Sequence, residues 1–303
     1  LAVGLTAENF GEGSYYPYDG WDYILADTVD AGTVYYMPSN TLFLLSNDIL
    51  DVKAYTAETP AAWETATLRS WLNGYDTDED SFIGTAFAPY ETGAMVTTAT
   101  TDSAADKVFL LSKDEAETVA YGFEDAFDRC AGSSYYADSL PGYDSSTWWL
   151  RSLAAGVGAY YVNLSGVIAG TVVSSAGIGV RPALMLDLDS VLFSTTEDVY
   201  PSAPFDLIGY SGGTRSLTVW DGAEGFDAEM ANTALAPMGE ATVTVTSLGS
   251  GSGYSQISAI LYQEGEVLCY GNIGTASTGD KTFDVPAGLE AGSYTLRLFA
   301  QSD

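Results

Sequence analysis

Residues 148–188 read WWLRSLAAGVGAYYVNLSGVIAGTVVSSAGIGVRPALMLDL, and this stretch decides how the first 200 residues are interpreted. WWLRS, at its start, is dense in apolar side chains, and the run LMLDLDSVLF that begins at Leu184 combines apolar and acidic residues. Short runs of this kind are typical of strands. Tyr, Gly and small polar residues occupy the positions between them. The stretch therefore predicts two strands joined by an aromatic, polar connection.

Helix signals lie upstream of this stretch. In residues 62–73, the apolar residues Leu68, Trp71 and Leu72 fall on one helical face, and Asn73-Gly74 supplies a stop. The sequence KVFLLSKDE at 107–115 combines an apolar run with a capping box, because Ser112 and Glu115 have the spacing that satisfies two free amide groups. We expect a buried strand followed by a helix there.

A domain boundary is predicted near STTEDVYPSAP at 194–204, since two closely spaced prolines disfavour a continuing helix or central strand. Downstream, short segments rich in β-branched and aromatic residues are separated by Gly, Ser and Asp turns. We therefore predict a first domain over 1–197, a linker over 198–204 and an all-β, immunoglobulin-like sandwich over 205–303.

Composition excludes several function classes. The chain has 303 residues, 41 acidic and 10 basic side chains, no histidine and two cysteines, with a formal net charge of −31. Such a chain lacks the basic surface that binds nucleic acid, and it is repelled by anionic membranes. Without histidine, neither a Ser-His-Asp nor a Cys-His site can form. Cys130 and Cys269 are too far apart in sequence for a CxxC site, so we expect reduced, buried thiols.

No apolar run is long enough to predict membrane insertion in these residues. The chain begins at Leu1 rather than at a methionine, and we therefore expect that a secretory signal has been removed.

Five motifs in order indicate a family. They are WETATLRSWLNGY at 63–75, FIGTAF at 82–87, KVFLLSKDE at 107–115, WWLRS at 148–152 and GVRPALMLDL at 179–188. Over residues 15–195 the chain resembles domain of unknown function 6273, which occurs in secreted and surface proteins of Gram-positive gut bacteria. The resemblance implies an α+β, C-type-lectin-like fold related to that of the formylglycine-generating enzyme. It also implies that the segment from Leu153 to Ile178 faces a ligand.

The enzymatic and sugar-binding relatives differ from this chain at their functional residues. The formylglycine-generating enzyme needs paired cysteines, whereas the first domain has Cys130 alone. Iron-dependent relatives need a histidine cluster, and calcium-dependent lectins need Glu-Pro-Asn or Gln-Pro-Asp together with Trp-Asn-Asp. None of these is present.

The segment from Tyr135 to Tyr161 is the most plausible recognition surface. Tyr gives a large contact area at low entropy cost, and small polar neighbours adapt their hydrogen bonds. In the alternative interpretation, these tyrosines shield a loop-rich core. The WWLRS residues are then structural, with one tryptophan and Leu150 on opposite sides of the strand and Arg151 paired with an interior carboxylate. Tyr161 is expected to face the core if Tyr160 faces outward. The candidate ligand-binding residues are Tyr135, Tyr136, Tyr143, Trp148, Tyr160 and Asn163.

Asp76, Asp78 and Asp80 alternate as in a calcium loop, which makes them a weak calcium candidate. The match fails at Ser81 and Phe87, where an EF-hand loop has glycine and a bidentate glutamate. A solvated acidic loop is the alternative. We predict no other cofactor.

The leading hypothesis is a non-catalytic extracellular or cell-surface binding module, for a glycan or a surface protein, followed by a β-sandwich spacer. A purely structural stalk or assembly protein is the alternative. A glycoside hydrolase that uses two carboxylates is a third hypothesis, although with so many acidic residues a close pair alone identifies nothing.

Overall fold

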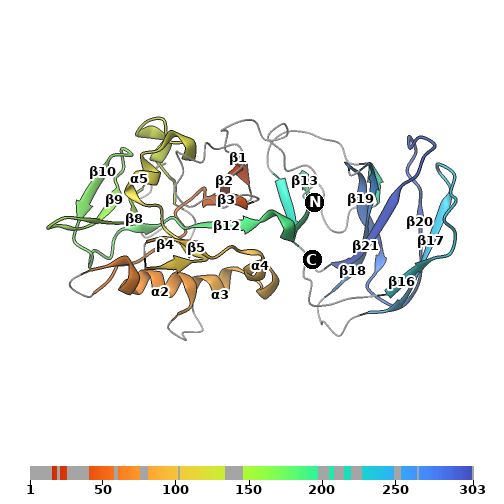
Figure 1. Cartoon of the computed structure of the whole chain (residues 1–303), viewed down its shortest axis with the longest axis horizontal. Helices are drawn as coiled ribbons and strands as arrows, with labels where there is room; N and C mark the ends of the chain where they lie inside the picture. The colour runs from red at the N-terminus through yellow and green to blue at the C-terminus, as the bar shows by residue number, and fades with distance from the viewer. Residues whose placement is uncertain are drawn as a thin grey trace. The chain divides into compact units, whose positions relative to one another are not determined.

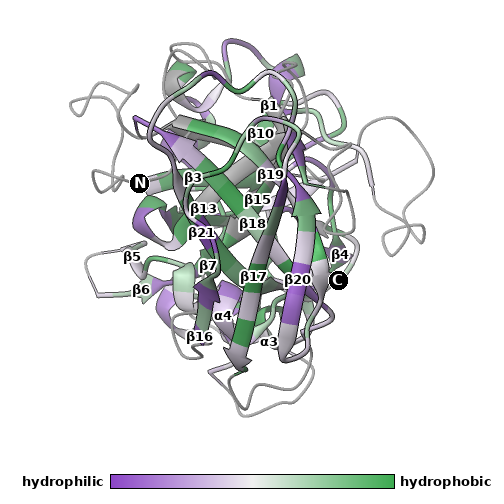
Figure 2. Cartoon of the chain, turned by 90° about the vertical axis from the view of Figure 1, so that its right-hand side faces the viewer, coloured by the Kyte–Doolittle hydropathy of each residue, from purple (hydrophilic) through white to green (hydrophobic). Residues whose placement is uncertain are grey.

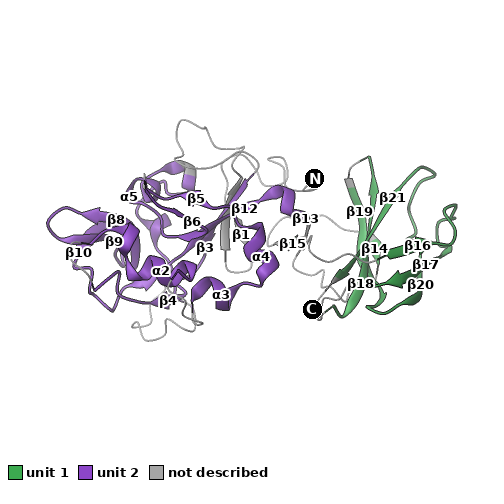
Figure 3. Cartoon of the chain, turned by 60° about the horizontal axis from the view of Figure 1, so that its bottom comes forward, with its two compact units in different colours: residues 1–4, 192–303 green, residues 5–191 purple. Residues whose placement is uncertain are grey.

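The computed structural model describes residues 16–18, 21–25, 41–57, 61–75, 81–101, 103–133, 146–196, 205–207, 215–219, 227–248, 254–264 and 266–301. These residues form two compact units, shown in different colours in Figure 3. The N-terminal unit extends to Val191, and the C-terminal unit begins at Leu192. The predicted linker over 198–204 lies outside the described residues, so the predicted domain limits stay a prediction.

One five-stranded sheet forms the centre of the N-terminal unit. All its neighbouring strands are antiparallel, in the order β1 (Tyr16–Tyr18), β2 (Trp21–Leu25), β3 (Thr41–Ser46), β12 (Ala183–Asp187) and β7 (Val108–Phe109). Every residue of β3 is buried, as are the first four of β12. Continuous apolar runs therefore form the central strands, because both faces of the sheet are covered.

A second five-stranded sheet carries the WWLRS segment. Its order is β10 (Ile168–Thr171), β9 (Gly158–Val162), β8 (Trp148–Ala154), β11 (Gly179–Val180) and β4 (Asp51–Val52). Only the β8–β11 pair is parallel. A β-carbon on Gly179 would lie 2.3 Å from Ile49 Cγ2 and 2.7 Å from the Thr147 carbonyl oxygen, so only glycine fits beside β8 there. A small pair, β5 (Thr98–Ala99) and β6 (Ala105–Asp106), completes the strands of this unit.

The helices of the N-terminal unit are short. The α-helices are α2 (Thr67–Asn73), α3 (Phe82–Ala86), α4 (Pro89–Ala94) and α5 (Lys113–Ala116), and single 3₁₀ turns are η2 (Trp63–Thr65), η3 (Val119–Tyr121), η4 (Phe127–Arg129) and η6 (Leu188–Ser190). Figure 1 shows α2, α3 and α4 along one side of the unit. No helix in the described part of the chain has the length and apolar character needed to cross a membrane.

In the described part of the C-terminal unit, all regular secondary structure is β-strand. One sheet has the order β14 (Asp206–Leu207), β19 (Glu266–Thr275), β18 (Gln256–Gln263), β21 (Thr295–Gln301), and another has β16 (Asp227–Met230), β17 (Glu240–Ser247), β20 (Gly279–Asp284). A third pairs β13 (Val191–Thr196) with β15 (Arg215–Val219). Buried and partly exposed residues alternate along β17, and the hydropathy colouring of the same strand also alternates in Figure 2. Val245, Ile257 and Ile273 come from both larger sheets and share one core.

The predicted fold class is wrong. The N-terminal unit is mostly β, in several small sheets, rather than an α+β C-type-lectin-like domain, and its longest described helix has seven residues. The helix expected over 62–73 is interrupted because Ala66 is extended and the Leu68 amide donates to the Tyr55 carbonyl, 3.1 Å away. The immunoglobulin-like sandwich is also not found, since the β18–β19 hairpin lies at the centre of a four-stranded sheet that ends in β14 and β21.

Several local predictions are confirmed. Gly74 adopts the left-handed conformation after α2. Ser112 Oγ accepts from the Glu115 amide at 3.1 Å, and the Glu115 carboxylate accepts from the Ser112 amide at 2.7 Å. Cys130 and Cys269 are free thiols, and Cys269 is buried as predicted, whereas the burial predicted for Cys130 is wrong because it is only half-buried. These features depend on neighbouring residues in sequence, which is why sequence patterns find them.

Candidate functional site

A half-exposed tyrosine on β9 lies beside an exposed glycine on the edge strand. Tyr160 pairs directly with Gly170 on β10, so both are on one face of the sheet. Gly170 has no side chain of its own, and a β-carbon there would lie 2.8 Å from Ala154 Cβ, so Ala154 occupies the space beside it. The Lys113 Nζ lies 5.9 Å from the ring centroid and forms an ion pair with Glu117. We call Lys113, Glu117, Ser152, Tyr160 and Gly170 the Tyr160 surface.

The capped start of α5 positions the charged pair of this surface. The Lys113 amide donates to Ser152 Oγ on β8 at 2.9 Å, which joins the first turn of α5 to the strand. Glu117 follows α5 directly, four residues after Lys113, a spacing at which helical side chains meet. The hydrogen bond with Glu117 raises the pKa of Lys113 above its usual value. The surface thus presents an ammonium, a carboxylate and an aromatic ring within a few ångströms.

A buried ion pair holds α5 and β8 together beneath the Tyr160 surface. Arg151 and Glu115 form a bidentate pair with N–O distances of 2.6 and 2.7 Å, and both are at least 96% buried. The Arg151 guanidinium also donates to the carbonyl oxygens of Leu110, at 2.6 Å, and Thr100, at 3.0 Å. Because Glu115 also completes the α5 capping box, the pair ties the helix start to the strand.

The segment of sequence that contains Tyr160 has no charged residue. The 29 residues from 152 to 180 include no Asp, Glu, Lys or Arg, in a chain of net charge −31. We call residues 152–180 the uncharged segment. Five of its apolar side chains are between 43% and 58% exposed, half of the exposed large hydrophobic side chains among the described residues. They are Leu153, Val157, Leu164, Val167 and Val172. Leu153 lies on β8, and the other four lie in the turns that flank β9 and β10.

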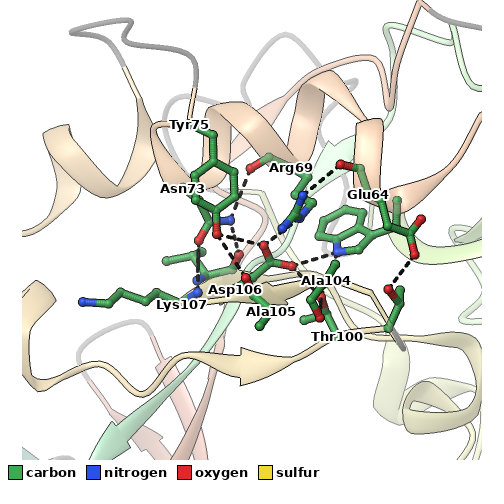
Figure 4. Close-up of polar contacts among 12 residues, drawn as sticks. Glu64, Arg69, Asn73, Tyr75, Thr100, Ala104, Ala105, Asp106 and Lys107 are labelled. Carbon is green, nitrogen blue, oxygen red and sulfur yellow. Dashed lines mark hydrogen bonds and ion pairs between the residues drawn. The ribbon is translucent and has the colours of Figure 1, made fainter.

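A second polar cluster surrounds Asp106 and is shown in Figure 4. Asp106 is fully buried, and its carboxylate accepts from Arg69 Nε at 2.7 Å, Trp63 Nε1 at 2.9 Å, Thr100 Oγ1 at 2.5 Å and Tyr75 OH at 3.1 Å. A carboxylate has about four acceptor positions, and all are used. This cluster therefore joins η2, α2 and β6 and has no acceptor capacity left for a ligand.

Asn73, the last residue of α2, fixes the next strand to the same cluster (Figure 4). Its Oδ1 accepts from the amides of Lys107 and Val108 at 3.1 and 3.0 Å, and its Nδ2 donates to the Val108 carbonyl at 2.8 Å. The asparagine side chain thus satisfies the backbone of β7 as a neighbouring strand would.

Residues 39–188 match a family model described as a domain of unknown function, DUF6273. The segment belongs to the DUF6273 family. No curated protein and no solved structure matches the chain. In this DUF6273 domain, the motif residues Trp63, Arg69, Asn73 and Arg151 all take part in buried or half-buried polar contacts of the scaffold. In this chain, these motif residues therefore belong to the interior of the domain.

The predicted site residues that the structure describes have different environments in the DUF6273 domain. Trp148 is fully buried, and its Nε1 donates to the Arg129 carbonyl at 3.0 Å, in agreement with the alternative that it is structural. Asn163 shapes the β9–β10 turn, since its Oδ1 accepts from the amides of Ser165 and Val167. Tyr161 packs edge-on against Trp149, with 6.5 Å between ring centroids.

The remaining predicted residues are not placed. Tyr135, Tyr136, Tyr143 and the calcium candidates Asp76, Asp78 and Asp80 lie outside the described residues. Among the residues that are described, no group of three His, Cys, Asp or Glu side chains has metal-binding geometry.

Sequence reasoning missed Lys113 and Glu117 as neighbours of Tyr160. Lys113 is 47 positions before Tyr160, so only the α5–β8 contact brings the two together. The capping box predicts where α5 begins, but nothing in the sequence indicates which strand lies beside it.

Proposed function

We propose that the DUF6273 domain is a non-catalytic extracellular binding module whose ligand, a glycan or a surface protein, contacts the Tyr160 surface. The observation that carries this proposal is the half-exposed Tyr160 ring, which lies near the Lys113–Glu117 pair and directly opposite the exposed residue Gly170 on β10. We further propose that the C-terminal unit is a β-sheet spacer.

The chemistry of this surface suits ligands with both apolar and hydroxyl-rich faces. An aromatic ring packs against the C–H face of a sugar or an apolar side chain. The ammonium of Lys113 can donate and the carboxylate of Glu117 can accept hydrogen bonds beside that ring. Val157, 52% exposed, adds apolar area near Gly170, since a β-carbon there would lie 3.6 Å from Val157 Cβ.

The ion pairs and hydrogen bonds of the buried carboxylates support a non-catalytic function. A catalytic acid needs a carboxyl group that can exchange a proton with a substrate. Asp106 and Glu115, the buried carboxylates of the described residues, each pair with an arginine and accept further hydrogen bonds. The chain also has no histidine to act as a general base.

Binding by the complete chain to arrays of bacterial and host glycans, and to labelled cell-surface proteins, tests this proposal. Each array is run with and without calcium. Tyr160→Ala should abolish binding, since it removes the ring and leaves the scaffold contacts in place. Tyr90→Ala is the matched control, because Tyr90 is a 37% exposed tyrosine of the same unit.

Two results would overturn the proposal. Equal binding by the wild-type chain and Tyr160→Ala would move the site elsewhere. Absence of binding to every glycan and protein, with a cooperative melt that shows an intact fold, would remove the binding function.

A further inference from the structure

Among the described residues, β10 is an edge strand that pairs on one side only. In the sheet order, β9 is the neighbour of β10, and no described strand lies on the other side. The Asn163 amide donates to the Val167 carbonyl at 2.9 Å, which makes this a hydrogen-bonded pair. Such pairs alternate along antiparallel strands. The backbone groups of Val167, Ala169 and Thr171 therefore face β9, and those of Ile168 and Gly170 face away from it.

No charged side chain lies on this edge strand, a property it shares with β1, β5, β7 and β13 among the described edge strands. Charged side chains and proline normally protect exposed edges from pairing with another chain. Here β10 lies inside the uncharged segment, and its flanking residues Val167 and Val172 are 50% and 58% exposed. Five other edge strands carry charge: β4 has Asp51, β14 has Asp206, β16 has Asp227 and Glu229, β20 has Asp280, Lys281 and Asp284, and β21 has Arg297.

We infer that β10 pairs antiparallel with β10 of a second copy of this chain. The charge distribution selects this occupant. Two copies that each carry a net charge of −31 repel one another over most approaches, and like charges directly opposite in a sheet are destabilising. When two copies approach through their uncharged segments, no charged residue of one β10 strand lies opposite a charged residue of the other.

The pattern of outward-facing backbone groups is complementary to itself. With a two-fold axis at Ala169, Ile168 of each copy lies opposite Gly170 of the other, so the outward-facing residues meet as hydrogen-bonded pairs. Ala169 then lies opposite Ala169 of the second copy. Opposite Gly170, the Ile168 side chain of the second copy would pack against Ala154 and Val157, which lie 2.8 and 3.6 Å from the position of a Gly170 β-carbon.

Such a dimer brings two ligand sites together. Ile168, Gly170 and Tyr160 share one face of the sheet, and a two-fold axis perpendicular to the sheet keeps that face common to both copies. Both Tyr160 surfaces are then presented on the same side, so a repeating ligand can bind both. The dimer goes beyond the proposed function, because it forms without a ligand.

Light scattering during size-exclusion chromatography of the complete chain, over a range of concentrations, measures the dimer. Val167→Lys should raise the dissociation constant at least tenfold, although the added charge reduces the overall repulsion. Met238→Lys is the matched control, since Met238 is 76% exposed and lies in the C-terminal unit. The dissociation constant of the wild-type dimer should fall as salt is added. The screening length at physiological ionic strength is about 8 Å, so part of the repulsion between the copies remains there and further salt removes it.

Disulfide trapping tests the register independently. In a Cys130→Ala background, Ala169→Cys places two thiols across a non-hydrogen-bonded pair, about 4.5 Å apart at Cα, which a disulfide can span. A covalent dimer should form rapidly. Val119→Cys, at a 60% exposed position of the same unit, is the control. A monomer at every concentration and salt, or equal trapping by both cysteines, would overturn the inference.

Discussion

Replacement of Glu115 by glutamine should unfold the N-terminal unit at markedly lower temperature. The change keeps the shape of the side chain but leaves the Arg151 guanidinium, 96% buried, without its counter-charge. Removing one partner of a buried ion pair costs about 3–5 kcal/mol. For a unit of this size, each kcal/mol lowers the melting temperature by about 2–4 °C. We therefore expect a decrease of roughly 6–20 °C.

Tryptophan fluorescence during thermal and urea unfolding measures this change selectively. Five of the six tryptophans precede Val191, so the signal reports mainly on the N-terminal unit. Glu117→Gln is the matched control, because the Lys113–Glu117 pair is partly exposed and surface pairs contribute about 0–1 kcal/mol. If Glu115→Gln and Glu117→Gln lower stability equally, the buried pair does not anchor α5 to β8.

Two further predictions concern single positions. Gly166 and Gly156 both have positive φ, but a β-carbon on Gly166 would lie 1.5 Å from the Ala126 carbonyl oxygen, whereas Gly156 has nothing within 4 Å. Gly166→Ala should therefore destabilise the unit far more than Gly156→Ala in urea unfolding; similar losses would contradict the contact. Burial raises the pKa of Cys269 from 9.0 to about 12, so this thiol should resist Ellman's reagent at pH 8 until the chain unfolds. The folded state holds the Cys269 proton more tightly than the unfolded state, so this thiol contributes to stability below pH 9. That contribution should decline as pH rises from 9 to 12 when unfolding is measured at a series of pH values. Rapid labelling of the native chain would contradict the burial of Cys269.

Local signals in the sequence predicted local structure. The capping box at Ser112, the stop at Gly74 and the burial of Arg151 against a carboxylate depend on a few neighbouring residues or on the cost of burying a lone charge. They were predicted for those reasons. Helix length was not predicted, because it depends on distant groups, such as the Tyr55 carbonyl that binds the Leu68 amide.

The fold class and the Tyr160 surface depend on the pairing of strands, which sequence patterns do not specify. The apolar run in β3 shows that the strand is buried, but not that β12 lies beside it. Likewise, the YYVNL pattern indicates that Tyr160 and Tyr161 face opposite sides, but not that Gly170 lies opposite Tyr160. Register is set by tertiary contacts, and one residue of slippage would exchange the two faces.

The contrast between the buried motif residues and the uncharged segment bears on how relatives of this domain should be compared. Trp63, Arg69 and Asn73 make contacts around α2 and β7, whereas Leu153, Val157, Leu164, Val167 and Val172 of the uncharged segment are exposed. Two chains that share the buried residues can thus differ at these exposed positions. Under the proposed function, transfer of a ligand from one member to another would require agreement at the positions of Lys113, Tyr160 and Gly170, in addition to a match to the family.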